Sequence, residues 1–493
     1  MFSGNYVEDQ QNQISIDMLD PNTMSIVLQY MNIGLIDLSE YSLATIGDIA
    51  VAANFLQMIE LIKQIEYTLE IQMCESNWME TMAIAETSSY SKLEQLSAAF
   101  GLYSFKSMKP EYISTIHKLA WYLSHPYLDT QSELDVFNFG LQWILHNETG
   151  ADALLIILGC LDFKRISKHD IEEIKKCTSE YENSLALKVA DCLYELSNNN
   201  LEICEAVLND KKSEFYEKFT ERVWIETINI IKESKTRLLS YTPVVPMWVL
   251  KNSKRELLPH YMYTYNNEKG FEQWLEVSEK DLWGWSVISW GLTKLVIVCG
   301  EHVAGKANNR TGIYMKDVKV YDTLKQEWTR HGVDLPPRSH AGLAVVGDSL
   351  YILGGKGEFT RELETAIIYD LKQRAYREID ELPEAICNPA VCSHKNMVYV
   401  AGEKQIFRYK AWGTSGKELI VFTKTLSIYP DILAVEQFSD DSKEKKPVVL
   451  FKQKKPSLRV NDFAGSCALA RGGTLKSLQI FLKKVAPSTF PNW

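Results

Sequence analysis

The sequence has few features of a membrane, secreted or nucleic-acid-binding protein. Its longest nearly uncharged apolar run, Ala151–Leu161, is far shorter than the ~20 residues that a membrane-spanning helix needs. Residues 1–11 have neither the basic region nor the apolar stretch of a signal peptide. With 64 acidic and 53 basic residues, the net charge of -11 opposes non-specific attraction to nucleic acid and anionic lipid. We therefore expect a protein of the cytoplasm, with the nucleus as an alternative, that neither inserts into membranes nor binds nucleic acid.

Cysteine is sparse and scattered. The 9 cysteines of the 493-residue chain are mostly single, which is typical of reduced thiols and not of a disulfide framework. The closest grouping is Cys387, Cys392 and His394, which is one ligand short of the four that a structural zinc site uses. The sequence therefore predicts no metal site and no other cofactor.

One stretch has the spacing of a phosphate-binding loop. An apolar run that ends at Val298 leads into Gly300-x-x-x-x-Gly305-Lys306, the order typical of nucleotide hydrolases. However, Ala307 stands where such a loop needs Ser or Thr for magnesium, and the following residues have the pattern of a turn and strands. We therefore expect a connection between strands and not a nucleotide hydrolase.

Up to about residue 235 the apolar residues recur at helical spacing. Asp20 is placed to cap a first helix, Pro21 suits its first turn and Gly34 suits its end. A short strand is expected at 35–39, after which Ser39 would cap a second helix. The apolar face of the first helix, which we expect to be buried, consists of Met24, Val27, Leu28 and Met31.

From about Thr242 the period changes to two, and Gly, Pro, Asn and Asp interrupt short apolar runs. Three of these runs end in glycine, at Gly300, Gly354 and Gly402, roughly every 50 residues. Each is preceded by another strand and a tight turn, and is followed by a strand that ends in tyrosine. One repeat therefore contains four strands, as a propeller blade does.

These repeats resemble kelch repeats, whose marks are a double glycine after an apolar strand and a later tyrosine and tryptophan about seven residues apart. Gly354-Gly355 keeps the double glycine, whereas Glu301 replaces its second member in the preceding repeat. Tyr321 and Trp328 keep the aromatic pair. The resemblance implies an all-β propeller.

The first half resembles the BTB and BACK domains that precede kelch repeats in kelch-like proteins. Residues 28–39 and 52–58 match the back part of a BTB domain. Residues 75–100 resemble the first helices of a BACK domain, and residues 133–144 match a later BACK helix. The order of these motifs is more specific than any one of them.

The expected fold class is therefore multidomain, with helices before strands. A partial BTB domain of the α+β class would occupy residues 1–73, and an all-α BACK domain residues 74–237. After a linker at 235–246, an all-β kelch propeller of about five blades would occupy residues 242–493.

Kelch-like proteins are substrate adaptors of cullin-3 RING ubiquitin ligases, so the resemblance implies a non-catalytic adaptor. Its BTB and BACK parts would bind cullin-3, and its propeller would bind an unidentified protein substrate. In the family the cullin contact includes a hydrophobic-x-glutamate motif, which falls on Tyr6 and Glu8 here, and the helix pair near Asn77 would extend it. The alternative for Tyr6 and Glu8 is a solvent-exposed loop without a partner.

A BTB domain of this family normally has a leading helix, a sheet and two further helices before the point that matches Met1. Because those parts supply most of the dimer interface, the sequence leaves homodimerisation and tight cullin binding open. We expect an isoform with an internal start, an incomplete gene model or a divergent member.

Propellers bind partners through the loops at one end of their channel. In this chain those loops carry a basic set that suits an acidic degron: Arg310, Arg338, His340 and Arg361. The alternative for Arg338 and His340 is to stabilise a turn within a blade. Two alternatives to the adaptor also remain, namely an actin-binding scaffold and a truncated form that binds substrate without cullin.

Overall fold

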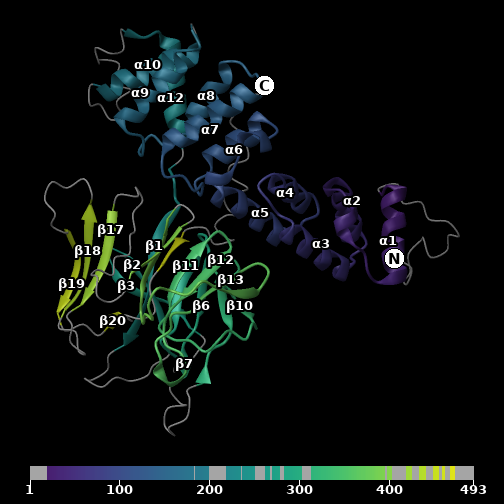
Figure 1. The fold of residues 1–493 in the computed structure, drawn as a ribbon. Helices are drawn as coiled ribbons and strands as arrows, with labels where there is room; N and C mark the ends of the chain where they lie inside the picture. Colours follow the sequence, from purple (N-terminus) through teal and green to yellow (C-terminus); the bar gives the residue numbers. More distant parts are fainter. Residues whose placement is uncertain are drawn as a thin grey trace. The chain divides into compact units, whose positions relative to one another are not determined.

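The chain divides into two compact units, with the boundary between Leu238 and Leu239. The structure, a computed structural model, describes residues 19–182, 184–198, 218–234, 236–249, 261–266, 269–277, 282–302, 313–394, 397–401, 418–424, 432–439, 448–454, 458–460 and 467–471. Figure 1 shows helices throughout the described part of the first unit and mainly strands in that of the second. Of the described helices, none has the length and apolar character to span a membrane.

The first unit is the helical unit. Its α-helices are α1 (Pro21–Ile33), α2 (Leu43–Phe55), α3 (Ile59–Ile71), α4 (Trp78–Thr87), α5 (Ser91–Tyr103), α6 (Ile116–Ser124), α7 (Glu133–His146), α8 (Asp152–Gly159), α9 (Lys168–Thr178), α10 (Leu185–Asn198) and α12 (Glu221–Glu233). Short 3₁₀ helices lie at Leu38–Glu40 (η2), Phe105–Ser107 (η3) and Pro110–Tyr112 (η4).

The ends of α1 are those that the sequence predicts. The Asp20 carboxylate accepts hydrogen bonds from the backbone N–H of Asn22 and Thr23, and Gly34 ends the helix with φ +79°. The expected apolar face is only partly buried: Val27 is fully buried, whereas Leu28 is 51% exposed and Met31 is 60% exposed.

The strand expected at 35–39 is wrong. The Asp37 carboxylate accepts hydrogen bonds from the backbone N–H and the hydroxyl of Ser39. Asp37 thus caps the N-terminus of η2, and residues 38–40 form a helical turn instead of a strand. Ser39 is therefore not the cap of the second helix. That role belongs to Ser42, whose hydroxyl accepts from the backbone N–H of Thr45 at 3.2 Å.

A buried ion pair holds the chain where it leaves the helical unit. Arg237 donates from Nε and Nη2 to the two carboxylate oxygens of Glu133 on α7, at 3.0 and 2.9 Å. Its Nη1 donates to the carbonyl oxygens of Leu123 and His125, at 2.8 and 3.0 Å. The backbone N–H of Arg237 donates to Asp162 at 2.9 Å. These four hydrogen bonds of the side chain and one of the backbone hold Arg237, which fixes the chain just before the boundary.

The second unit is the strand unit, and its strands form antiparallel sheets. The strands are β1 (Ser240–Val249), β2 (Tyr261–Asn266), β3 (Gly270–Glu276), β4 (Leu282–Trp283), β5 (Ser286–Trp290), β6 (Lys294–Val298), β7 (Glu301–His302), β8 (Ile313–Tyr314), β9 (Val318–Asp322), β10 (Glu327–His331), β11 (Gly342–Val346), β12 (Ser349–Leu353), β13 (Ala366–Asp370), β14 (Ala375–Ile379), β15 (Ala390–His394), β16 (Met397–Ala401), β17 (Glu418–Lys424), β18 (Ile432–Ser439), β19 (Val448–Lys454), β20 (Leu458–Val460) and β21 (Cys467–Arg471).

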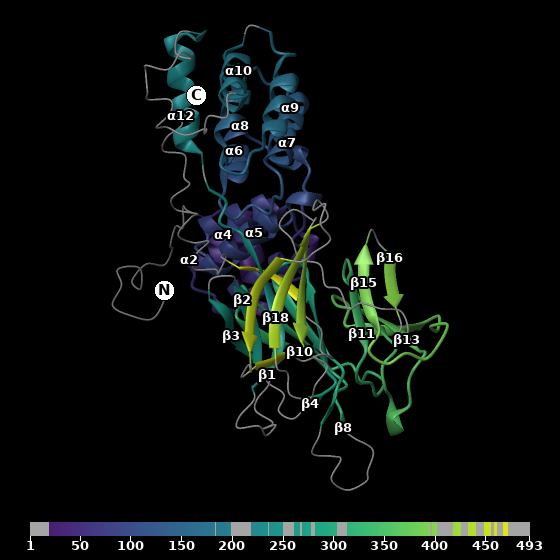
Figure 2. The same ribbon diagram turned by 90° about the vertical axis from the view of Figure 1, so that its left-hand side faces the viewer.

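Two sheets are complete four-stranded meanders, β5-β6-β9-β10 and β11-β12-β13-β14. The small strands β7 and β8 are inserted between β6 and β9 and join β4 in a separate three-stranded sheet. Strand β15 lies beside β11 and pairs with β16 (Figure 2). The blade pattern of the sequence is thus present in both complete sheets.

Strand β1 pairs with β2 on one side and with β20 and β21 on the other. It begins at Ser240, inside the segment 235–246 that was expected to be a linker. Val244 and Val245 are fully buried or nearly so, which explains why this part of the segment joins a sheet. The first and the last described strands of the unit therefore share one sheet.

Apolar side chains fill the space between neighbouring sheets. One cluster joins β6 and β9 to β11, β12 and β13 and includes Val296, Val320, Leu350 and Ile367. A second joins β1 and β2 to β5 and β6 and includes fully buried Trp285. The sheets thus pack face to face, as blades do.

Candidate functional site

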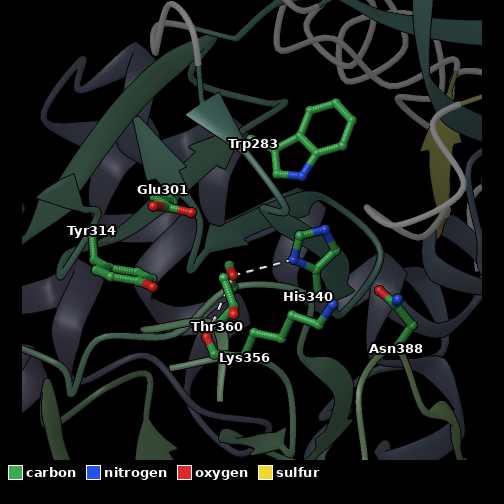
Figure 3. Close-up of a pocket in the computed structure, with 8 residues that line it drawn as sticks. Trp283, Glu301, Tyr314, His340, Lys356, Thr360 and Asn388 are labelled. Carbon is green, nitrogen blue, oxygen red and sulfur yellow. Dashed lines mark hydrogen bonds between the residues drawn. The ribbon is translucent and has the colours of Figure 1, made fainter. Parts of the chain in front are cut away.

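A pocket of about 260 Å³ opens on the strand unit. Its walls come from short strands, from loops that connect one sheet to the next, and from the connection between β12 and β13 (Figure 3). The lining residues are Trp283, Glu301, Tyr314, Ser339, His340, Lys356, Thr360 and Asn388. Because the loops that connect rigid sheets commonly carry binding residues, this pocket is the candidate functional site.

One wall is a row of three residues across the sheet β4-β7-β8. Glu301 on β7 lies directly opposite Trp283 on β4 and Tyr314 on β8. Directly opposed residues of an antiparallel sheet point to the same face, so the carboxylate lies between two aromatic side chains. Glu301 is only 7% exposed, and burial, together with the Glu301 and Glu358 charges, raises the pKa of Tyr314.

The second wall is formed by the connection before β11. His340 has a positive φ of +58° and is held by backbone hydrogen bonds, from its N–H to Gly284 and from Asn388 to its carbonyl oxygen. Its Nδ1 lies 3.1 Å from the hydroxyl of Ser339 (Figure 3). Ser339 and Lys356 pair as an isolated β-bridge. This wall is therefore held in place by its backbone.

Arg338 is buried and bonded within the sheet that follows it. It is 3% exposed, and its Nη1 donates to the carbonyl oxygens of Gly354 and Thr365 at 2.6 and 2.8 Å. Its Nη2 donates to the Thr365 hydroxyl at 2.7 Å. Burial lowers the pKa of Arg338. These contacts favour the alternative in which Arg338 stabilises a turn, and they correct the expectation that its guanidinium is presented to a partner.

The loop that carries Arg361 is exposed and strained. Phe359 and Thr360 both have positive φ, +57° and +59°, and the Phe359 side chain is 82% exposed. The loop is closed by a hydrogen bond from the Gly357 N–H to the Arg361 carbonyl oxygen, at 2.9 Å. The Tyr314 hydroxyl donates to the Gly357 carbonyl oxygen at 2.8 Å, which ties the loop to the pocket. Thus His340 lines the pocket, and Arg361 lies on an adjoining loop.

The remaining expected site residues do not join this pocket in the described structure. Tyr6, Glu8 and Arg310 lie outside the described residues. Asn77 lies before α4 in the helical unit, where its Oδ1 accepts from the Cys74 N–H at 2.8 Å. Its Nδ2 donates to the Gln72 carbonyl oxygen at 2.9 Å. Asn77 therefore shapes the turn between α3 and α4.

The stretch that resembles a phosphate loop continues as a strand. Glu301 and His302 form β7 directly after Gly300, and residues 303–312, including Lys306, lie outside the described residues. A phosphate loop would instead lead into a helix.

The closest grouping of cysteines in the sequence is not a metal site within the described ranges. Of its two cysteines, Cys387 is buried and Cys392 is exposed on β15. Within the described ranges, no three His, Cys, Asp or Glu side chains gather as metal ligands would.

Sequence reasoning missed most of the pocket, although one signal pointed to it. Glu301 stands where the kelch pattern has its second glycine, and this departure lies at the centre of the aromatic row. In the next repeat the corresponding glycine, Gly355, has φ +102°, and an added Cβ would lie 2.5 Å from the Ser339 carbonyl oxygen. A side chain therefore fits at position 301 and would clash at position 355.

The comparisons with known proteins agree with the repeat pattern. The Kelch motif matches residues 337–383, which contain the whole sheet β11-β12-β13-β14. In that sheet Tyr369 lies opposite Tyr376, and in the preceding sheet Tyr321 lies opposite Trp328 with ring centroids 5.1 Å apart. The seven-residue spacing of the kelch aromatic pair thus corresponds to directly opposed cross-strand positions in both sheets.

Several curated proteins are similar over most of this chain. Kelch-like protein 40 of Xenopus tropicalis is 23% identical over 418 residues, 82% of this chain and 66% of that protein. Kelch-like protein 25 of Homo sapiens is 23% identical over 427 residues, 83% of this chain and 65% of that protein. Kelch-like protein 40a of Danio rerio is 36% identical over 86 residues, 17% of this chain and 14% of that protein.

The chain spans about two thirds of the length of the first two of these relatives. The similarity includes both the helical unit and the strand unit, because it extends over about four fifths of the chain. The Kelch motif and these similarities together show that the chain resembles kelch-like proteins over both units.

Proposed function

We propose that this chain is a substrate-recognition adaptor of a cullin-3 RING ubiquitin ligase. In this proposal the strand unit is a propeller of about five blades that binds the target protein. The observation that carries the proposal is the pocket, whose walls come from connections between and within the sheets and overlap the Kelch motif at residues 337–383. A pocket at such a position suits the binding of a protein segment.

The helical unit would provide the cullin-binding side of the adaptor. We propose that residues 1–73 are BTB-like and residues 74–237 are BACK-like, as the sequence resemblance implies. The cullin contact would then include Tyr6, Glu8 and the α4–α5 pair after Asn77. The chemistry of ubiquitin transfer would belong to other subunits, so the proposal assigns no catalytic residue to this chain.

Co-precipitation of the full chain with purified cullin-3 tests this proposal. We expect the wild-type chain to retain cullin-3, and the double variant Tyr6→Ala with Glu8→Lys to retain at least about tenfold less, because hydrophobic and acidic anchors carry much of such contacts. Glu301→Gln, in the pocket of the other unit, is the matched control and should retain cullin-3 as the wild type does.

A properly folded chain without cullin affinity would refute the adaptor proposal for this form. Cosedimentation with actin filaments in the same preparation would then support the scaffold alternative. Size-exclusion chromatography with light scattering would show in parallel whether the chain forms the homodimer that the family resemblance suggests.

A further inference from the structure

We propose that the pocket wall formed by Trp283, Glu301 and Tyr314 receives a cationic side chain, lysine or arginine, from the protein that the strand unit binds. This inference rests on the proposed function, because it names the chemistry of the partner that enters the pocket. It differs from the acidic partner that the sequence alone suggested for Arg310, Arg338, His340 and Arg361.

The geometry of the row carries the inference. The register of β4, β7 and β8 places Glu301 directly between the two aromatic residues, on the same face of the sheet. Opposed residues in an antiparallel pair have Cβ atoms about 4.5–5.5 Å apart. In Figure 3 the Glu301 carboxylate and the hydroxyl end of Tyr314 point in the same direction, into the space that Trp283 and His340 border.

The chemistry of the row suits a cation. A carboxylate forms strong, short hydrogen bonds with ammonium and guanidinium groups, and aromatic faces attract the same groups. Because Glu301 is 7% exposed, its interaction with a cation is screened less by water than that of a surface carboxylate. A carboxylate has about four acceptor positions, so the inference does not require that Glu301 lack other contacts.

Among the described residues, the guanidinium of Arg338 and the ammonium of Lys356 are directed elsewhere. Arg338, the strongest candidate for binding an acidic group, has its guanidinium bonded to Gly354 and Thr365. In the view of Figure 3 the Lys356 side chain extends toward Asn388 and away from Glu301. The pocket thus has a carboxylate between aromatic rings at one end and a lysine at the other.

The test uses the full chain and immobilised peptide pools. Each pool contains random short peptides with one fixed central residue, either lysine, arginine, norleucine or glutamate. We expect the lysine and arginine pools to retain at least about fivefold more protein than the norleucine pool, because norleucine has a similar length and no charge.

Variants assign the preference to the row. Glu301→Gln should reduce retention on the lysine and arginine pools to the norleucine level. Its matched control is Glu272→Gln, an exposed carboxylate on β3 outside the pocket lining, which should leave the preference unchanged. Circular dichroism and melting temperature verify folding, and Trp283→Leu, which keeps the carboxylate, provides a second variant that should lower retention at least about threefold.

The outcomes separate this inference from the proposed function. Preferential retention on the glutamate pool, or a cation preference that survives Glu301→Gln, would refute the cationic partner while leaving the adaptor intact. Equal retention on every pool would also refute it. The cullin-3 experiment is independent, since it concerns the helical unit.

Discussion

Arg237 and Glu133 form a buried ion pair with two hydrogen bonds, although they are far apart in the sequence. The Arg237 side chain is 1% exposed and that of Glu133 is 0% exposed. Since Arg237 also donates to three carbonyl oxygens, of Leu123, His125 and Cys160, its charge and its hydrogen-bonding groups are well matched. The pair links α7 to the end of the helical unit.

We predict that Arg237→Ala lowers the free energy of unfolding of the helical unit by about 3–5 kcal/mol, because it removes both hydrogen bonds of the ion pair and leaves the buried Glu133 carboxylate only Arg165, 3.9 Å away, as a cation. Urea denaturation followed by circular dichroism at a helical wavelength measures this change. Lys63→Ala is the control, since Lys63 and Glu60 form an ion pair with side chains 64% and 76% exposed. That variant should change stability by less than about 0.5 kcal/mol.

We predict that Arg338→Ala destabilises the strand unit by about 2–4 kcal/mol, because it removes the guanidinium donors of the Gly354 carbonyl oxygen and of the Thr365 carbonyl and hydroxyl oxygens. Arg361→Ala, on the exposed loop, should cost less than about 0.5 kcal/mol. Calorimetry on both variants measures the difference. An equal melting temperature for the two would contradict the structural role of Arg338.

We predict that Gly355→Ala destabilises the strand unit by about 2–5 kcal/mol. The new methyl group would lie 2.5 Å from the Ser339 carbonyl oxygen, and φ is +102°. Gly347→Ala is the matched control, because Gly347 also has a positive φ, +59°, but no atom within 4 Å of the added Cβ. It should cost about 1 kcal/mol, from backbone strain alone. Similar thermal melts for both variants would show that the contact with Ser339 relaxes.

We predict that the stability of the strand unit falls as the pH is lowered from about 6.5 to 4. Burial, with the Arg374 and Lys294 charges, lowers the pKa of His331 to about 4, and its Nδ1 lies 2.9 Å from the Tyr369 hydroxyl. In this pH range the unfolded chain binds a proton at this histidine that the folded chain does not bind, so protonation favours unfolding.

Melting temperatures at pH 7.5 and pH 5.0 measure this dependence. The drop between the two should be smaller for His331→Gln than for the wild type, because glutamine can still contact Tyr369 but does not titrate. An identical drop in both proteins would exclude His331 as the cause.

Features set by neighbouring residues could be predicted from the sequence. The start and end of α1 follow from Asp20, Pro21 and Gly34, which act within one turn of the helix. The spacing of Tyr321 and Trp328 corresponds to opposite positions across one hairpin. In both cases the physical cause lies within a few residues.

Features that depend on distant residues could not be predicted in this way. The guanidinium of Arg338 finds its partners at Gly354 and Thr365, so the residue type alone did not reveal its burial. The pocket combines side chains from separate connections, and no local pattern placed Trp283 beside Glu301. Similarly, Leu28 has the helical spacing of a core residue and yet is half exposed, because packing decides which side of the apolar stripe is covered.

The pairing of β1 with β20 and β21 has a consequence for synthesis on the ribosome. Strand β1 is translated about 220 residues before β21, which at ~5–20 residues per second takes roughly 10–45 s. During that interval the backbone groups on the β20/β21 side of β1 lack their native partner strands. This edge can therefore pair with other nascent chains. Chaperone occupancy on ribosome-bound chains should therefore persist until the last strands emerge.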